Sequence, residues 1–252
     1  MEFIARIVEG GPPPSGEHLV LSDQELDGAD FSGRKLHQLD VYGCRFRRCR
    51  FERMRVNAAF LGAGDLSEYV ECSFDGSRFR HLGNGGFARF VRCSFHDIDF
   101  KHWICTAVEM VDCVFTGKLR EVVLHSTVFD PWERERVHRE RNEYHGNDFS
   151  GVTDFNVAFR TGIDLSQQRL PSGPDFLYLP DAARSVEAAR YEISKWEPAD
   201  RSEAEWKLER YAKDIAGGQR QLLIRRSDLL HSKIPKLARI APALLQVLEA
   251  VA

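Results

Sequence analysis

The chain has 252 residues, 43% of them hydrophobic and 29% charged, which suits one globular domain or a domain with an appendage. Its net charge of −3 gives no overall attraction to nucleic acid or membranes, so direct nucleic-acid binding is not expected. No apolar run approaches the roughly 20 residues of a membrane span, and no basic-then-apolar leader opens the chain, so we expect a cytoplasmic protein without a membrane partner.

Residues 1–18 carry no repeat and are predicted to form an N-terminal cap and linker. Beyond them every fifth residue is apolar, a period that belongs to neither a helix nor a strand. The phase of this period slips three times. Its apolar centres are Leu21, Leu26, Phe31, Leu36, Val41, Phe46, Phe51, Val56, Leu61, Leu66, Phe74, Phe79, Phe90, Phe95, Phe100, Cys105, Met110, Phe115, Leu119, Leu124 and Phe129.

The position two residues before a centre is small or apolar at most centres, Gln24 and Arg34 being exceptions. Five of the six cysteines occupy it, namely Cys44, Cys49, Cys72, Cys93 and Cys113. Each five-residue unit therefore offers one large and one small side chain to an interior, and three residues to water. The cysteines are expected to be reduced and to act as small apolar groups.

The segment Ala29-Asp30-Phe31-Ser32-Gly33 resembles the consensus of the pentapeptide-repeat family, Ala-Asp/Asn-Leu/Phe-X-X, and residues 147–151 match it closely. The resemblance covers about residues 19–130 and 147–170. It implies a mainly β fold, a right-handed quadrilateral β-helix over residues 19–170, with each residue above the one 20 positions earlier. The expected interior columns place Leu26 beneath Phe46 beneath Leu66, Phe31 beneath Phe51, and Phe95 beneath Phe115.

Three interruptions of the period predict loops near 67–73, 81–88 and 131–146. Loops carry function more often than regular coils do, so residues within them are candidates for contact with a partner. These candidates are Tyr69, Asn84, Trp132 and Tyr144. The third interruption is highly charged and predicts a short exposed helix or lid, whose two aromatic residues either line a pocket with His138 and His145 or hold the lid in place.

Arginines gather at outward positions 45, 47, 48, 50, 53 and 55. Two interpretations are open: Arg45, Arg47, Arg48 and Arg50 form a basic face for a partner, or they belong to an ion-pair ladder. The 20-residue rule favours the ladder, because it places Arg45 above Glu25, Arg47 above Asp27 and Arg50 above Asp30. Residues 19–130 hold 15 Lys/Arg and 16 Asp/Glu, so this part of the chain is nearly neutral.

Residues 171–252 have helical periodicity and are predicted to form a helical C-terminal region. One helix is expected over 182–196, and Ser202-x-x-Glu205 resembles a capping box that opens a second. Residues 222–230 either continue that helix or restart it after Gly217-Gly218. The segment 234–251 is predicted to cap the last coil, to form a homodimer, or both, through Leu237, Leu244, Leu245, Leu248 and Val251 on one face.

No phosphate-binding loop, nucleophile elbow or HExxH motif occurs in the sequence. Cys93-x-x-His96 has a spacing seen in metal sites, yet the period points the cysteine inward and the histidine outward. We therefore expect a binding protein that has no enzymatic activity, no cofactor and no metal ion.

The best-understood activity of the pentapeptide-repeat family is protection of type II topoisomerases. The resemblance thus implies a protein partner such as DNA gyrase or topoisomerase IV, protected from a poison by a protein that resembles DNA, as antibiotic resistance or self-immunity. A nearly neutral solenoid is a poor mimic of a duplex that carries one charge per ~1.7 Å. The alternative is an adaptor that holds an unrelated protein partner.

Overall fold

The computed structural model describes residues 17–83 and 86–252, and the chain divides into two compact units. The first, here called the solenoid unit, contains residues 1–158 and 166–170; the second, the C-terminal unit, contains residues 159–165 and 171–252. The predicted N-terminal cap at 1–18 lies outside the described residues except for its last two. Among the described residues, no helix combines the length and the apolar character needed to cross a membrane.

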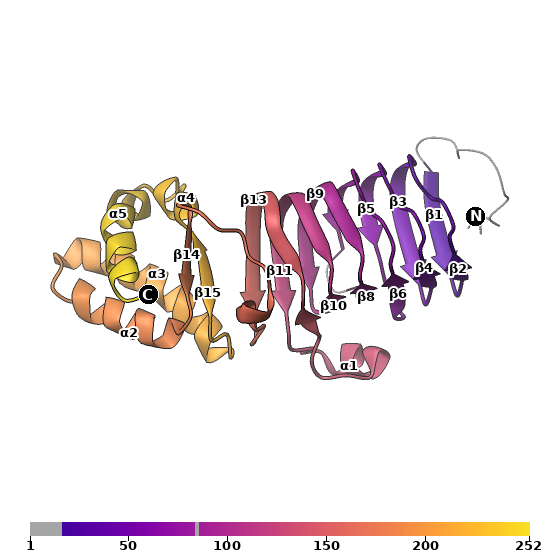
Figure 1. The fold of residues 1–252 in the computed structure, drawn as a ribbon. Helices are drawn as coiled ribbons and strands as arrows, with labels where there is room; N and C mark the ends of the chain where they lie inside the picture. The colour runs from indigo at the N-terminus through magenta and orange to yellow at the C-terminus, as the bar shows by residue number, and fades with distance from the viewer. Residues whose placement is uncertain (1–16, 84–85) are drawn as a thin grey trace. The chain divides into compact units, whose positions relative to one another are not determined.

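The solenoid unit is a β-solenoid of about five turns made of parallel strands, as expected from the sequence (Figure 1). One sheet has seven strands: β1 (Glu17–Ser22), β3 (Lys35–Tyr42), β5 (Arg55–Phe60), β7 (Arg78–Leu82), β9 (Ser94–Cys105), β11 (Val114–His125) and β13 (Asp148–Arg160). The other has six: β2 (Glu25–Asp27), β4 (Arg45–Arg47), β6 (Ser67–Val70), β8 (Phe87–Val91), β10 (Ala107–Val111) and β12 (Tyr144–His145).

The apolar centres fill the interior in columns that run from coil to coil. One column consists of six phenylalanines whose rings stack nearly parallel, with centroids 4.6–5.0 Å apart: Phe31, Phe51, Phe74, Phe95, Phe115 and Phe149. This spacing matches the ~4.8 Å distance between hydrogen-bonded strands. The predicted columns Phe31–Phe51, Phe95–Phe115 and Leu26–Phe46 are therefore confirmed.

Successive coils turn at one corner through residues in the left-handed backbone region. Arg48, Glu71, Arg92 and Asp112 all have φ between 51° and 56°, and each donates its backbone N–H to a carbonyl of the next coil. In the following coil the corner is Gly146, with φ 67°, where an added Cβ would lie 1.9 Å from Asp112 Oδ1. The corner thus fixes where each coil bends, and it brings charged side chains of neighbouring coils together.

The expected column from Phe46 to Leu66 is wrong. Tyr69 lies over Phe46, with ring centroids 4.9 Å apart, because three residues are inserted in the loop at 62–66. The predicted break at 67–73 is misplaced for the same reason, since residues 67–70 form β6. The break predicted at 81–88 matches the connection between β7 and β8, of which residues 84–85 lie outside the described residues.

The third predicted break, at 131–146, contains the expected short helix, α1 (Pro131–Val137). Asp130 caps its N-terminus by accepting a hydrogen bond from the Trp132 backbone N–H, and the buried Val137 anchors its last turn. Just before it, Phe129 was expected to be an interior centre; it is 52% exposed, while Val128 is fully buried. The bulge between Phe115 and Gly117 accounts for the earlier step to Leu119, and the error at Phe129 reflects a further slip of one residue between the buried Leu124 and Val128.

The C-terminal unit combines a two-stranded antiparallel sheet with four helices. Its elements are β14 (Phe176–Leu179), α2 (Ala182–Ile193), α3 (Pro198–Ala216), β15 (Leu222–Arg225), α4 (Arg226–Leu230) and α5 (Pro235–Ala250), and a 3₁₀ turn, η1 (Leu165–Gln167), precedes them. The buried Gln219 side chain joins the segment 159–165 to this unit, since it accepts from the backbone N–H groups of Gly162 and Ile163.

Two predictions for this region are wrong in detail. The second helix begins at Pro198, four residues before the proposed capping box, because the fixed φ of proline suits the first helical position. Residues 222–225 form β15 and pair with β14, so the helix does not continue there, and it restarts at residue 226 as α4. The β14 strand was not anticipated, since a four-residue apolar segment gives little periodicity to read.

Candidate functional site

Three of the six clustered arginines, Arg45, Arg48 and Arg50, pair with acidic residues of the preceding coil in the predicted ion-pair ladder. Arg45 pairs with Glu25 at 3.0 Å, and Arg50 pairs with Asp30, as expected. The predicted pair of Arg47 with Asp27 is wrong: Arg48, at the left-handed corner, takes Asp27 instead. Arg47 is exposed and has no ion pair among the described residues.

The ladder continues with alternating sign over five of the six strands of this sheet, from β2 to β10. Register partners run from Glu25 on β2 through Arg45, Glu68 and Arg89 to Glu109 on β10. The closest nitrogen–oxygen distances at successive steps are 3.0, 3.7, 4.0 and 3.1 Å. Every charge on this column therefore has a neighbour of opposite sign, which identifies Arg45 as part of the scaffold.

Two of the predicted partner-binding residues are core residues. Tyr69 has no exposed surface and donates its hydroxyl to the Leu61 carbonyl at 2.9 Å. Tyr144 is 7% exposed and lies in register with Met110, in the column that contains Tyr69. The sequence predicts loops at both positions, because the residues inserted before them shift the five-residue period. Neither side chain offers the exposed surface that contact with a partner would need.

Trp132 is half exposed and packs edge-on against Phe87, with ring centroids 5.3 Å apart. The Arg136 guanidinium lies over the Trp132 ring, 5.2 Å from its centroid. The alternative that an aromatic contact holds this segment against the coils is therefore confirmed. Asn84, the remaining loop candidate, lies outside the described residues.

The five residues proposed for dimerisation do not form a free surface. Leu237, Leu244, Leu245 and Leu248 are each at most 4% exposed and lie in the core of the C-terminal unit. They pack there against apolar residues of α2, α3 and the β14–β15 sheet. Val251 is partly exposed at the end of α5. The apolar face of the last helix is thus used within its own chain.

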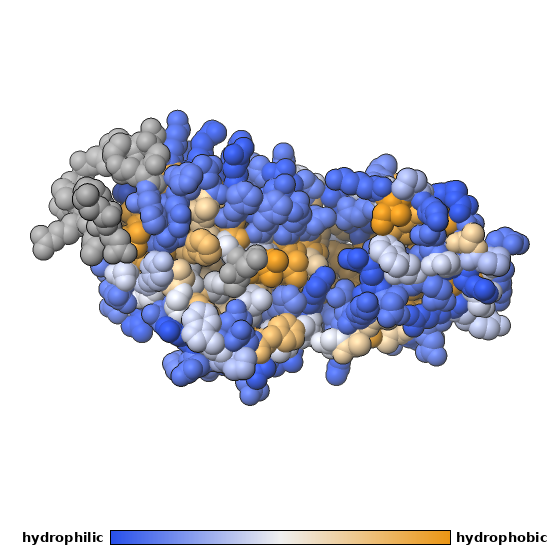
Figure 2. All heavy atoms as spheres, turned by 180° about the vertical axis from the view of Figure 1, so that it is seen from behind, coloured by the Kyte–Doolittle hydropathy of each residue, from blue (hydrophilic) through white to orange (hydrophobic). Residues whose placement is uncertain are grey.

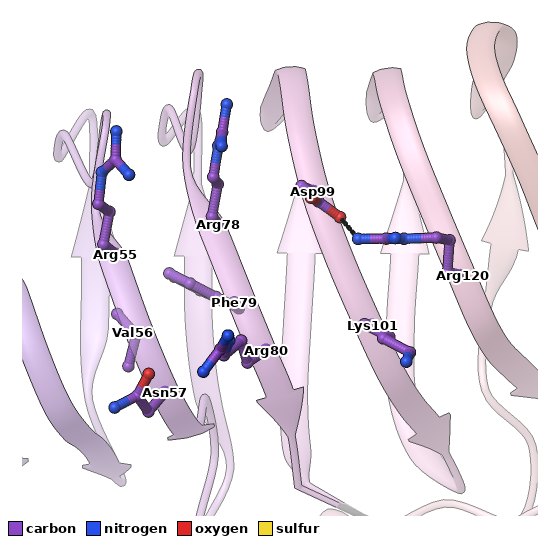
Figure 3. A pocket seen from close by; sticks show the side chains of 9 residues that line it. All are labelled: Arg55, Val56, Asn57, Arg78, Phe79, Arg80, Asp99, Lys101 and Arg120. Carbon is purple, nitrogen blue, oxygen red and sulfur yellow. Dashed lines mark hydrogen bonds and ion pairs between the residues drawn. The ribbon is translucent and has the colours of Figure 1, made fainter.

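A basic groove on the outer face of the seven-stranded sheet is a surface that sequence reasoning missed. It has a volume of about 570 Å³ and is lined by Arg55, Val56, Asn57, Arg78, Phe79, Arg80, Asp99, Lys101 and Arg120. Figure 3 shows Arg55 and Arg78 extending side by side from β5 and β7. Asn57 and Arg80 lie further along the same two strands, and Asp99, Lys101 and Arg120 lie on β9 and β11. Val56 and Phe79 belong to the buried interior.

Charges of the same sign repeat over three strands beside this groove, up to Asp99, the register partner of Arg78 on β9. Lys35, Arg55 and Arg78 are consecutive register partners on β3, β5 and β7. A second basic column on the same sheet contains Arg80, Lys101 and Arg120. Arg80 and Lys101 each follow a member of the register pair Phe79–Phe100, and Arg120 is the register partner of Lys101. Five basic side chains thus line the groove together with one acidic side chain, Asp99.

Acidic side chains compensate only one end of the groove. Asp99 pairs with Arg120, as Figure 3 shows, and Lys101 lies 3.5 Å from Glu121. Arg55, Arg78 and Arg80 are exposed, and none of them has an ion-pair partner among the described residues. Like charges directly opposite on neighbouring strands destabilise a sheet by about 0.2–1 kcal/mol per pair. The Lys35–Arg55–Arg78 column therefore costs stability, which an anion bound between these groups would offset.

The remaining surface and the interior hold weaker candidates for a functional site than the basic groove. Hydrophilic side chains cover most of the face drawn in Figure 2, with hydrophobic ones in small groups between them. All six cysteines are buried, and burial raises the pKa of Cys44 and of Cys105. No group of three or more potential metal ligands occurs among the residues that the structure describes. The basic groove is thus the strongest candidate site.

A scan against protein-family models finds no match for this chain, and a search of curated proteins finds none with significant similarity. The resemblance to the pentapeptide-repeat family therefore remains an expectation from the sequence, carried by the five-residue period and by segments such as 29–33.

Proposed function

We propose that this protein is a non-enzymatic binding protein, in which the β-solenoid is a scaffold and the basic groove holds an anionic macromolecule. The observation that supports this most directly is the column of Lys35, Arg55 and Arg78, three like charges in register. On the other sheet of the same unit, each charged residue of the ladder faces one of opposite sign. The contrast is explained if one sheet serves stability and the other serves binding.

The side chains that line the basic groove are suited to binding an anion. Guanidinium and ammonium groups attract anions and keep their charge at neutral pH, so they are poorly suited to transferring protons. The one carboxylate of the lining, Asp99, is already paired with Arg120. A regular solenoid provides an extended surface of the kind that repeat proteins use to hold partners.

Retention on a phosphate-bearing cation-exchange resin tests this function. The groove variant Arg55→Gln/Arg78→Gln/Arg80→Gln should elute at clearly lower salt than the wild type. The ladder variant Arg45→Gln/Arg48→Gln/Arg50→Gln removes the same net charge from other surfaces and is the matched control. Equal shifts for the two variants would show that only net charge matters and would contradict an anion site in the groove.

Protection of a type II topoisomerase is a more specific alternative, supported by the resemblance of segments such as 29–33 to the pentapeptide repeat. We place it second, because the groove is basic, whereas a mimic of DNA needs a negative surface. A gyrase supercoiling assay with a poison present tests it: protection by the purified protein would favour it, and unchanged inhibition would remove it.

A further inference from the structure

We propose that the basic groove binds the phosphate backbone of double-stranded DNA without reading its sequence. This inference rests on the proposed function, since it names the anionic partner of the same groove. It does not follow from the summed charge of the chain, which is −3; it follows from the way charges are separated onto different faces.

The residue types favour phosphate as the anion. Four of the five basic residues of the lining are arginines. Each guanidinium presents a rigid fork of N–H donors that matches phosphate oxygens bidentately, and it gives up its hydration more easily than an ammonium group does. Arg55, Arg78 and Arg80 have these donors free of ion pairs within the described chain.

The spacing favours a regularly charged polymer. Two basic columns at different register positions together span five successive strands: Lys35, Arg55 and Arg78 on β3 to β7, and Arg80, Lys101 and Arg120 on β7 to β11. The first column ends at β9, where Asp99 is the register partner of Arg78. Four steps of ~4.8 Å make a track about 20 Å long. A DNA duplex presents roughly a dozen charges over this length, all of one sign. An acidic protein surface rarely offers such an uninterrupted row, because basic and acidic residues are normally interspersed on it.

The lining also favours a duplex over a single strand. Proteins that hold single strands combine a basic groove with exposed aromatic rings on which bases stack. The one aromatic residue of this lining, Phe79, has no exposed surface and belongs to the interior column with Phe100. Besides the charged groups, Asn57 is the only polar side chain of the lining, which leaves little means of reading base edges. Contacts to the backbone give affinity without sequence preference.

Fluorescence anisotropy with a labelled duplex of arbitrary sequence tests the proposal, with the salt dependence as the main readout. Neutralising Z phosphates gives a slope of about −0.9Z in a plot of log K against log salt, so four or five contacts predict about −4. The groove variant Arg55→Gln/Arg78→Gln/Arg80→Gln should lose about three units of slope and at least about tenfold in affinity at low salt. The ladder variant Arg45→Gln/Arg48→Gln/Arg50→Gln should keep the slope of the wild type.

Three further probes distinguish a failure of the duplex proposal from a failure of the proposed function. A second duplex of unrelated sequence should bind within about twofold of the first, and a tenfold difference would refute sequence-independent binding. Poly-glutamate, or a single strand, bound as tightly as the duplex and with the same sensitivity to the groove variant would overturn the duplex proposal but leave the anion site intact. Absence of binding to all these probes would overturn the proposed function as well.

Discussion

Phe51 and Phe74 stack face to face in the interior, with ring centroids 5.0 Å apart and planes 9° from parallel. They belong to different coils, separated by the loop that contains the three inserted residues. The stack continues across this loop without a gap, since Phe31 lies on one side of the pair and Phe95 on the other. The insertion is therefore accommodated outside the core.

Replacing Phe51 with alanine should lower the free energy of unfolding by about 3–5 kcal/mol, because the fully packed column leaves no room to collapse around the cavity. Chemical denaturation monitored by circular dichroism measures this. Phe129→Ala is the control: its ring is 52% exposed, so a change below about 1 kcal/mol is expected. A loss below 1 kcal/mol for Phe51→Ala would show that the column does not carry the core.

The cysteines should be unreactive in the folded protein. All six are buried, and the pKa of Cys105 lies well above its ordinary value because burial disfavours the thiolate. Titration with a thiol reagent at pH 8 should modify none of them within minutes, and all six after denaturation. Rapid modification of one cysteine before unfolding would identify a thiol that is accessible and contradict its structural role.

Much of the solenoid could be predicted from the sequence, because a pattern of one large and one small inward side chain in every five residues is compatible with few other folds. The columns fail only where residues are inserted or deleted, as at Leu66 and Phe129, since a fixed step of 20 cannot register such changes. The C-terminal helices were predicted from their periodicity. The β14–β15 pair was not predicted, because 42 residues separate its two short strands in the chain.

The basic groove could not be predicted by the same reasoning. Arg55 and Arg78 are 23 residues apart, so the rule of 20 does not bring them together. The nearly equal numbers of acidic and basic residues also suggested a neutral solenoid, although the charges are separated by face. The sequence contains the basic residues that form this groove, but the register of each coil must be known before they can be placed next to one another.

The pair of substitutions Leu244→Glu/Leu248→Glu should unfold the C-terminal unit and should not act as a simple block to dimerisation. Both side chains are fully buried in that unit, and a buried carboxylate without a partner is strongly unfavourable. Loss of helical circular dichroism measures this effect. The control Ala243→Glu/Gln246→Glu adds two charges to the exposed face of the same helix and should leave the spectrum unchanged. A folded monomer from the first variant and a wild-type dimer would restore the dimerisation hypothesis.

Glu109→Ala should cost far more than the removal of an exposed charge. The Glu109 carboxylate is 6% exposed and lies 3.1 Å from both Arg89 and Arg139, and it also accepts the backbone N–H of Glu143. Its removal leaves Arg139, whose side chain is 15% exposed, without its closest acidic neighbour. A loss of about 3–5 kcal/mol is typical when one partner of a buried ion pair is removed. Arg48→Ala, which breaks an exposed pair, should cost at most about 1 kcal/mol in the same denaturation experiment.

Arg55→Glu should stabilise the protein while it weakens binding. The substitution places an acid between Lys35 and Arg78, so the column would alternate in sign as the ladder on the other sheet does. Two like-charge contacts become attractive, which should raise the free energy of unfolding by about 0.2–1 kcal/mol per contact. Retention on the phosphate-bearing resin should fall at the same time, because the central charge of the groove is reversed.

Arg45→Glu is the matched control and should have the opposite effect on stability. It gives the same change in net charge, but it places an acid between Glu25 and Glu68, so two attractive contacts become repulsive. Thermal melts of the two variants in low salt, where exposed charges are least screened, compare them directly. If Arg55→Glu is stabilised relative to the wild type and Arg45→Glu destabilised, the like charges at Arg55 and Arg78 are retained at a cost to folding, which is the expected mark of a binding site. If Arg55→Glu also melts earlier, the basic column contributes to stability, and its like charges do not mark a binding site.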